Sequence, residues 1–118
     1  MKTPELPLFV LWEKALADLL DRTSKFPKSA RFTFSSRIDN ICLDILEKIV
    51  EARYSSGEEK ERALKEIDLA LARLRVLLRV CHDRNYLSHG GFEHVIRQVD
   101  EAGRMVGGWR REQAGRKE

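Results

Sequence analysis

The chain has 118 residues, which suits one domain. Its 42% hydrophobic and 35% charged residues are typical of a helix-rich protein, because Leu, Ala, Glu, Lys and Arg dominate. No apolar run approaches the roughly 20 residues of a membrane span and no export signal is visible, so we expect a cytoplasmic protein without membrane contact. The net charge of +3 predicts a polyanionic partner only if the basic residues cluster.

The first helix is expected from Pro7 to Ser24, because proline is tolerated in a first turn, where its missing N–H has no partner. Its predicted apolar stripe consists of Phe9, Leu16 and Leu20, with Val10 or Trp12 beside them. Pro27 then opens a second helix, expected from Lys28 to Arg53. The apolar repeat of that helix is Phe34, Ile38, Ile41, Ile45 and Ile49, widened by Cys42, Leu46 and Val50.

A third helix is expected from Glu58 to Arg84, with Ser56 or Gly57 as its cap. Its core face is predicted to carry Leu64, Ile67, Ala70, Leu71, Leu74, Leu77, Leu78 and Cys81. A fourth helix, capped by Ser88 if it starts before the glycines, is expected to end near Trp109. We therefore expect residues 1–110 to form an all-α, up-down-up-down antiparallel four-helix bundle, with residues 111–118 as a polar tail.

A second apolar stripe runs along the third helix, nearly opposite the centre of the core face. Its members are Leu69, Val76, Val80 and Leu87, spaced by seven, four and seven residues. A monomeric bundle buries one stripe per helix, so the second stripe predicts an oligomer interface. Contact with another protein, or scattered surface residues, would also account for it.

Basic residues gather in two places. Five of them, and no acid, lie between Arg22 and Ile38, whereas four arginines face one acid between Arg73 and Arg84. Arginine suits bidentate phosphate contact, and a helix start adds free N–H groups. The candidate nucleic-acid-binding residues are Lys28, Arg31, Arg37, Arg73, Arg75, Arg79 and Arg84. The alternatives are a solvated face, intersubunit salt bridges, and Phe26 and Phe32 plugging the end of the core.

Enzymatic signatures are sparse. The three histidines and two cysteines show no zinc-ligand spacing, and no hydrolase, metalloprotease or phosphate-loop motif occurs, so we expect no metal, no cofactor and no catalysis. One exception is Arg84 followed five residues later by His89, a pattern similar to that of HEPN ribonucleases. That resemblance implies arginine and histidine from two subunits meeting at a scissile phosphate.

Four phrases spread along the chain carry a stronger resemblance. They are TPELPLF at residues 3–9, KFPKSARF at 25–32, VEARY at 50–54 and GRMVGGW at 103–109. Together they resemble the accessory variability determinant family, related to proteins of intervening sequences in bacterial ribosomal RNA genes. The resemblance implies a ring-shaped homopentamer of four-helix bundles that partners the reverse transcriptase of a diversity-generating retroelement.

The leading hypothesis is therefore a non-enzymatic accessory protein that binds RNA or cDNA and the reverse transcriptase during mutagenic retrohoming. An intervening-sequence type of protein acting near ribosomal RNA is the second hypothesis. A HEPN-like ribonuclease is the third.

Overall fold

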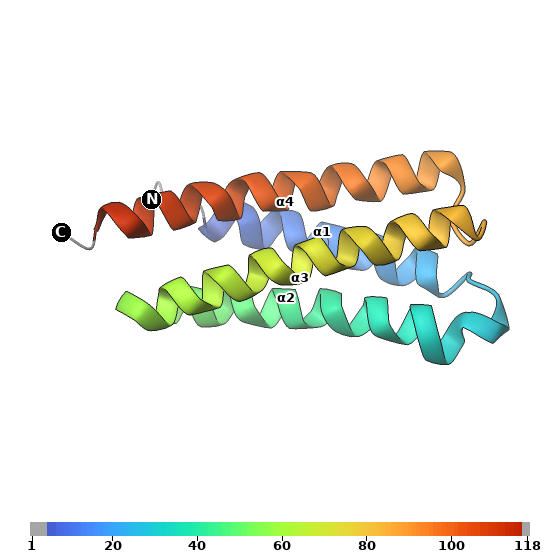
Figure 1. The fold of residues 1–118 in the computed structure, drawn as a ribbon, viewed down its shortest axis with the longest axis horizontal. Helices are drawn as coiled ribbons and strands as arrows, with labels where there is room; N and C mark the ends of the chain where they lie inside the picture. Colours follow the sequence, from blue (N-terminus) through green and yellow to red (C-terminus); the bar gives the residue numbers. More distant parts are fainter. Residues whose placement is uncertain (1–4, 117–118) are drawn as a thin grey trace.

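The computed structural model describes residues 5–116, which form helices without a strand in that range. Four long helices lie side by side in a bundle about 50 × 24 × 20 Å in extent (Figure 1). They are α1 (Glu5–Thr23), α2 (Ser36–Tyr54), α3 (Gly57–Asp83) and α4 (His89–Gly115). Each helix packs on its neighbours in the chain, and α4 closes the bundle against α1. The predicted all-α four-helix fold is confirmed.

The two ends of the bundle differ in what they carry. The α1–α2 and α3–α4 connections lie together at one end, called the loop end here and comprising residues 24–35 and 84–88 (Figure 1). The short α2–α3 turn lies at the other end, beside the last turns of α4. The most basic stretch of the chain is therefore brought next to the end of α3.

α1 buries a face different from the predicted one. The core side chains are Leu8, Trp12, Ala15 and Leu19, which follow helical spacing. The predicted members Phe9 and Leu16 only flank this face, and Leu20 is exposed. The face is set by Trp12, whose buried indole N–H requires an acceptor and donates to the carbonyl of Cys42 in α2 at 2.9 Å.

The second helix is not α-helical from its start. A 3₁₀ turn (Lys28–Ala30) and a π-helical segment (Arg31–Ser35) precede α2. The backbone N–H of Ser36 donates to the carbonyl of Arg31, five residues earlier, and the buried residues Ala30 and Ser35 are also five apart. The predicted core of α2 is confirmed at Ile38, Ile41, Ile45 and Ile49, whereas Val50 is 43% exposed.

α3 and α4 complete the core. The core face predicted for α3 is confirmed, with Leu64, Ile67, Leu71, Leu74, Leu78 and Cys81 fully buried. The Ser88 cap is also confirmed, because its Oγ accepts the N–H of Gly91 at 3.0 Å. The predicted end of α4 near Trp109 is wrong. The helix continues to Gly115 because Gln113 still packs in the bundle, so residues 111–115 of the predicted tail are helical.

The two cysteines are free and buried, Cys42 in α2 and Cys81 in α3. Burial raises the pKa of Cys42 to about 12, and the nearby Asp39 carboxylate raises it further. Burial likewise raises the pKa of Cys81 to about 11. Both therefore act as small apolar core side chains.

Candidate nucleic-acid interface

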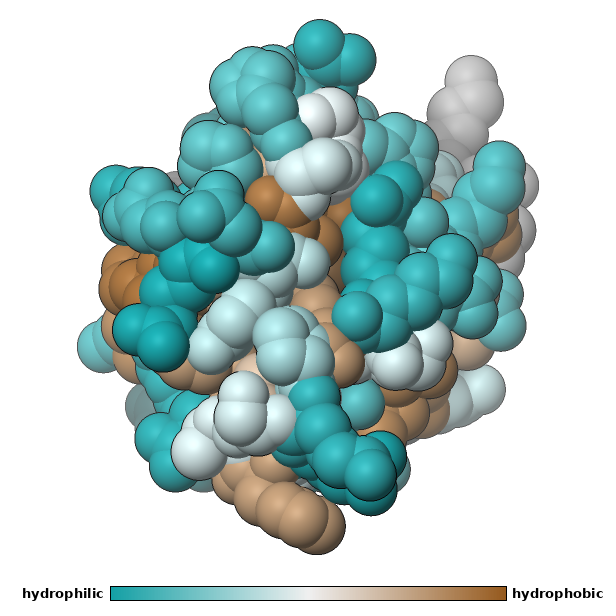
Figure 2. Space-filling view, turned by 90° about the vertical axis from the view of Figure 1, so that its right-hand side faces the viewer, coloured by the Kyte–Doolittle hydropathy of each residue, from teal (hydrophilic) through white to brown (hydrophobic). Residues whose placement is uncertain are grey.

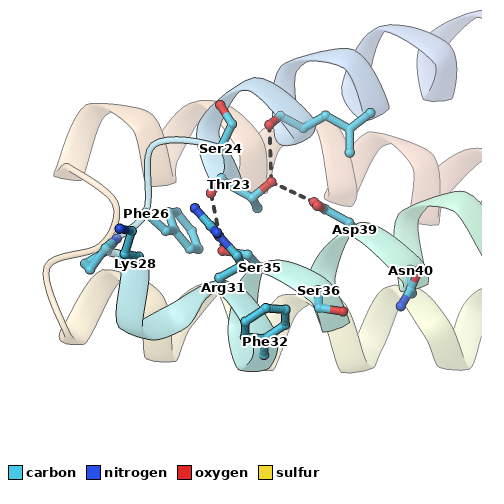
Figure 3. A pocket seen from close by; sticks show the side chains of 12 residues that line it. Thr23, Ser24, Phe26, Lys28, Arg31, Phe32, Ser35, Ser36, Asp39 and Asn40 are labelled. Carbon is cyan, nitrogen blue, oxygen red and sulfur yellow. Dashed lines mark hydrogen bonds between the residues drawn. The ribbon is translucent and has the colours of Figure 1, made fainter.

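A hollow of about 400 Å³ opens at the loop end, between the last turn of α1 and the start of α2. Lys28, Arg31 and Phe32 contribute to one part of its lining, and Asp39 and Asn40 to another. Figure 3 shows Arg31 directed toward Thr23 at the end of α1, with Phe32 on the other side of Arg31 from Thr23. Two predicted phosphate-binding residues thus border one cavity.

Hydrogen bonds hold the frame of this hollow. Thr23 Oγ1 donates to Asp39 Oδ1 at 2.6 Å, which joins α1 to α2 (Figure 3). Ser35 Oγ donates to the carbonyl of Thr23 at 3.3 Å from a buried position. Because the Asp39 carboxylate accepts a short bond, it is held in place on its own wall of the hollow.

Aromatic rings close the core beneath the hollow. Phe26 and Phe34 each lie against the ring of Tyr86, with centroids 5.5 and 5.9 Å away. Of the two residues expected to plug the core, Phe26 does so at 8% exposure, whereas Phe32 is 86% exposed. The plug interpretation is therefore wrong for Phe32.

Two more predicted cations lie at the same end. Arg37 lines a second hollow of about 260 Å³ together with Phe34 and Leu77. Arg84 donates from Nε to the Tyr86 hydroxyl at 3.0 Å and lies over that ring, and this bond raises the pKa of Arg84. Figure 2 looks onto this end, where hydrophilic residues surround smaller apolar areas.

The other three arginines occupy the length of α3. Arg75 Nε pairs with Asp100 Oδ1 of α4 at 2.9 Å, so its charge is compensated within the subunit. Arg73 and Arg79 are exposed and have no ion pair among residues 5–116. Arg73 lies about 16 Å along the helix from Arg84, at 1.5 Å per residue. The seven predicted residues therefore do not form one patch.

Lys28, Arg31 and Arg37 differ from the paired cations of the bundle. None of them takes part in an ion pair within residues 5–116, where Arg22, Lys48 and Arg110 all have carboxylate partners. Their charge is therefore available to an external anion. This makes the loop end the best candidate for a nucleic-acid interface.

The second apolar stripe is shorter than predicted. Leu69, Val76 and Val80 are 56%, 50% and 36% exposed along α3, but Leu87 is buried at 5%. α3 ends at Asp83, and Asn85 has a positive φ of 66°, so the chain turns before Leu87. Leu87 belongs to the core and cannot continue a face of α3.

The acidic stretch from Glu58 to Asp68 is partly neutralised by α4. Arg110 Nη1 pairs with Asp68 Oδ2 at 2.7 Å, and Lys60 lies 5.8 Å from the centroid of the Trp109 ring. Glu61 borders a hollow with Arg110 and Arg111. These contacts were missed because α4 was expected to end before its last basic turns.

The histidines do not form a metal site. His82 stacks on Phe92 at 4.6 Å and lies 5.4 Å from His89, whereas Arg84 is engaged with Tyr86. Between residues 5 and 116, no three His, Cys, Asp or Glu side chains gather as potential metal ligands. No helix in the described part of the chain is long and apolar enough to cross a membrane.

The family model that matches the sequence is described as bAvd-like, and the match covers residues 11–113. The chain belongs to the bAvd-like family. This confirms the resemblance to the accessory variability determinants. Membership supports an accessory, non-catalytic protein of the retroelement kind. No curated protein matches the sequence significantly.

Proposed function

We propose that this bAvd-like protein binds RNA or cDNA together with the reverse transcriptase of its retroelement and thereby supports mutagenic retrohoming. The observation that carries the nucleic-acid part is the group of cations at the loop end, Lys28, Arg31 and Arg37, which have no ion pair within residues 5–116. Membership of the family supports the retroelement part. Cytoplasmic location belongs to the same proposal.

The proposed mechanism is electrostatic scaffolding. Cations at the loop end replace counterions along the nucleic-acid backbone, so affinity falls steeply as salt rises. Arg84 adds charge beside Tyr86, while Arg73 and Arg79 extend the basic surface along α3. Arg75 contributes little because Asp100 already compensates it. The protein holds RNA close to the polymerase and takes no part in bond breaking.

Self-association is the second part of the proposal. Leu69, Val76 and Val80 leave an apolar stripe exposed along α3, which a second copy would bury. We propose a ring-shaped homopentamer, as the family resemblance implies. In a cyclic ring every copy presents its loop end at the same height along the axis, so the basic ends share one rim and their fields add.

Two measurements test this proposal. The co-expressed reverse transcriptase of the retroelement should co-purify with the tagged protein and retain template RNA. Light scattering should give about five times the 13.7 kDa subunit mass. Val76→Asp should lower that mass, whereas the control Val10→Asp on α1, where Val10 is 49% exposed against 50% for Val76, should not. A monomeric wild type, or a polymerase that never co-purifies, would contradict the corresponding part.

A further inference from the structure

Phe32 is the most exposed large apolar side chain of the described residues, at 86%. Burying a phenylalanine is worth about 1.5–3 kcal/mol, so this ring gives no stability to the isolated subunit. Phe34, two residues on, is half-buried and packs on Tyr86. The two aromatic residues of this segment therefore have different tasks.

The π-helical segment explains why Phe32 faces outward. Ala30 and Ser35 are both buried although they are five residues apart, so one wide turn carries Arg31, Phe32 and Thr33 on its outer side. The carbonyl of Arg31 accepts the N–H of Ser36 within that turn. The backbone thus presents a cation and a ring next to each other, at the rim of the hollow.

Charge is divided across the hollow. Lys28 and Arg31 lie in the 3₁₀ and π-helical turns and have no ion pair within residues 5–116. The Asp39 carboxylate belongs to α2 and is held by Thr23, with Ser36 and Asn40 from the same helix also lining the hollow. A phosphate is attracted by the cations and repelled by Asp39. An elongated ligand therefore has one favourable orientation.

We propose that this hollow, in which the exposed ring of Phe32 adjoins the unpaired cations Lys28 and Arg31, binds one nucleotide of a single-stranded nucleic acid. The base stacks on Phe32, and its phosphate lies at Lys28 and Arg31. Ser36 and Asn40 supply polar groups for the edge of the base. This inference rests on the proposed nucleic-acid function and assigns it a binding site.

The chemistry selects a single strand. An aromatic ring stacks only on a base that has left its neighbours, and duplex bases keep their faces covered. Stacking tolerates any base, since every base has a π-face, and the cations contact only the backbone. The site therefore favours unpaired segments of a template with little dependence on sequence.

The test compares the binding of a fluorescent oligouridylate of about 12 nucleotides with that of a duplex of the same length. Phe32→Ala should weaken single-strand binding about tenfold, since stacking on one base is worth roughly 1–3 kcal/mol, and should leave duplex binding unchanged. Phe32→Tyr should restore it, and Phe32→Leu should not. Tyr54→Ala is the matched control, because Tyr54 is 79% exposed at the other end of α2.

Further readouts separate the possible failures. A 2-aminopurine base in the oligonucleotide should change its fluorescence on binding to the wild type but not to Phe32→Ala. If Phe32→Ala binds the single strand as tightly as the wild type, the stacking site is refuted while the proposed function stands. If Phe32→Ala changes the mass seen by light scattering, Phe32 is a subunit contact and the inference is refuted. If the wild type binds no nucleic acid, the nucleic-acid part of the proposed function fails as well.

Discussion

Trp12 of α1 donates its indole N–H to the backbone carbonyl of Cys42 in α2, across a distance of 2.9 Å inside the core. Both residues are completely buried. The bond fixes the rotation of α1, and it therefore decides that Leu8, Ala15 and Leu19 face inward. It also orients the end of α1, where Thr23 reaches Asp39 at the hollow.

Removing this hydrogen bond should destabilise the bundle without changing its surface. Trp12→Phe loses one buried donor and part of a ring, so we expect a loss of about 1–3 kcal/mol in the free energy of unfolding. Urea unfolding followed by circular dichroism measures it. Leu20→Ala, at an exposed position of the same helix, is the control and should cost much less. Equal losses would show that Trp12 does not fix α1.

The rotation of α1 shows where sequence periodicity stops. Phe9, Leu16 and Leu20 form a helical stripe as good as Leu8, Ala15 and Leu19, because alanine carries a weak hydrophobic signal. The choice depends on a partner for Trp12, which lies 30 residues away in the chain. In contrast, the core face of α3 was predictable, because its buried residues are mostly large and aliphatic over several turns.

The candidate site was only partly predictable. The cations at residues 28, 31 and 37 are visible in the sequence, but the pairing of Arg75 with Asp100 is a tertiary contact that no local pattern shows. The π-helical turn that exposes Phe32 has no motif of its own. Leu87 fits the heptad spacing and fails only because the helix ends at Asp83. The five-residue interval between the small residues Ala30 and Ser35 is the one signal that was available.

The glycines of α4 should respond differently to alanine. An added Cβ at Gly107 meets its nearest atom, in the Arg111 side chain, at an ordinary 3.6 Å, so the gain in helix propensity should stabilise the protein by about 0.5–1 kcal/mol. At Gly91 the Cβ lies 2.5 Å from Arg22 Nη1 and 3.1 Å from the capping Ser88 Oγ. Gly91→Ala should therefore lower the thermal midpoint. A higher midpoint for both variants would contradict this packing.

Stability should fall at alkaline pH because of the buried thiols. The folded pKa of Cys42 is about 12 and that of Cys81 about 11, against an ordinary value of 9.0. The unfolded chain releases these protons first, so the stability is intact below pH 9 and is lost as pH rises toward the folded pKa values. Cys42→Ala should show a shallower loss in denaturant midpoint above pH 9. An unchanged slope would contradict the burial effect.

The protein should leave RNA intact. Arg84 is bonded to Tyr86 and His89 lies beside His82, and the family supports a non-catalytic role. A structured RNA incubated with the purified protein should show no cleavage on a denaturing gel. Cleavage that disappears in both Arg84→Ala and His89→Ala would establish the ribonuclease alternative instead.

The salt dependence of RNA affinity tests the central claim most directly. The double variant Lys28→Ala/Arg31→Ala should bind more weakly and reduce the slope of log affinity against log salt by about one or two contacts. The control Lys14→Ala/Lys65→Ala removes the same charge at exposed positions on α1 and α3 and should keep the wild-type slope. Equal slopes for the two double variants would contradict a nucleic-acid interface at the loop end.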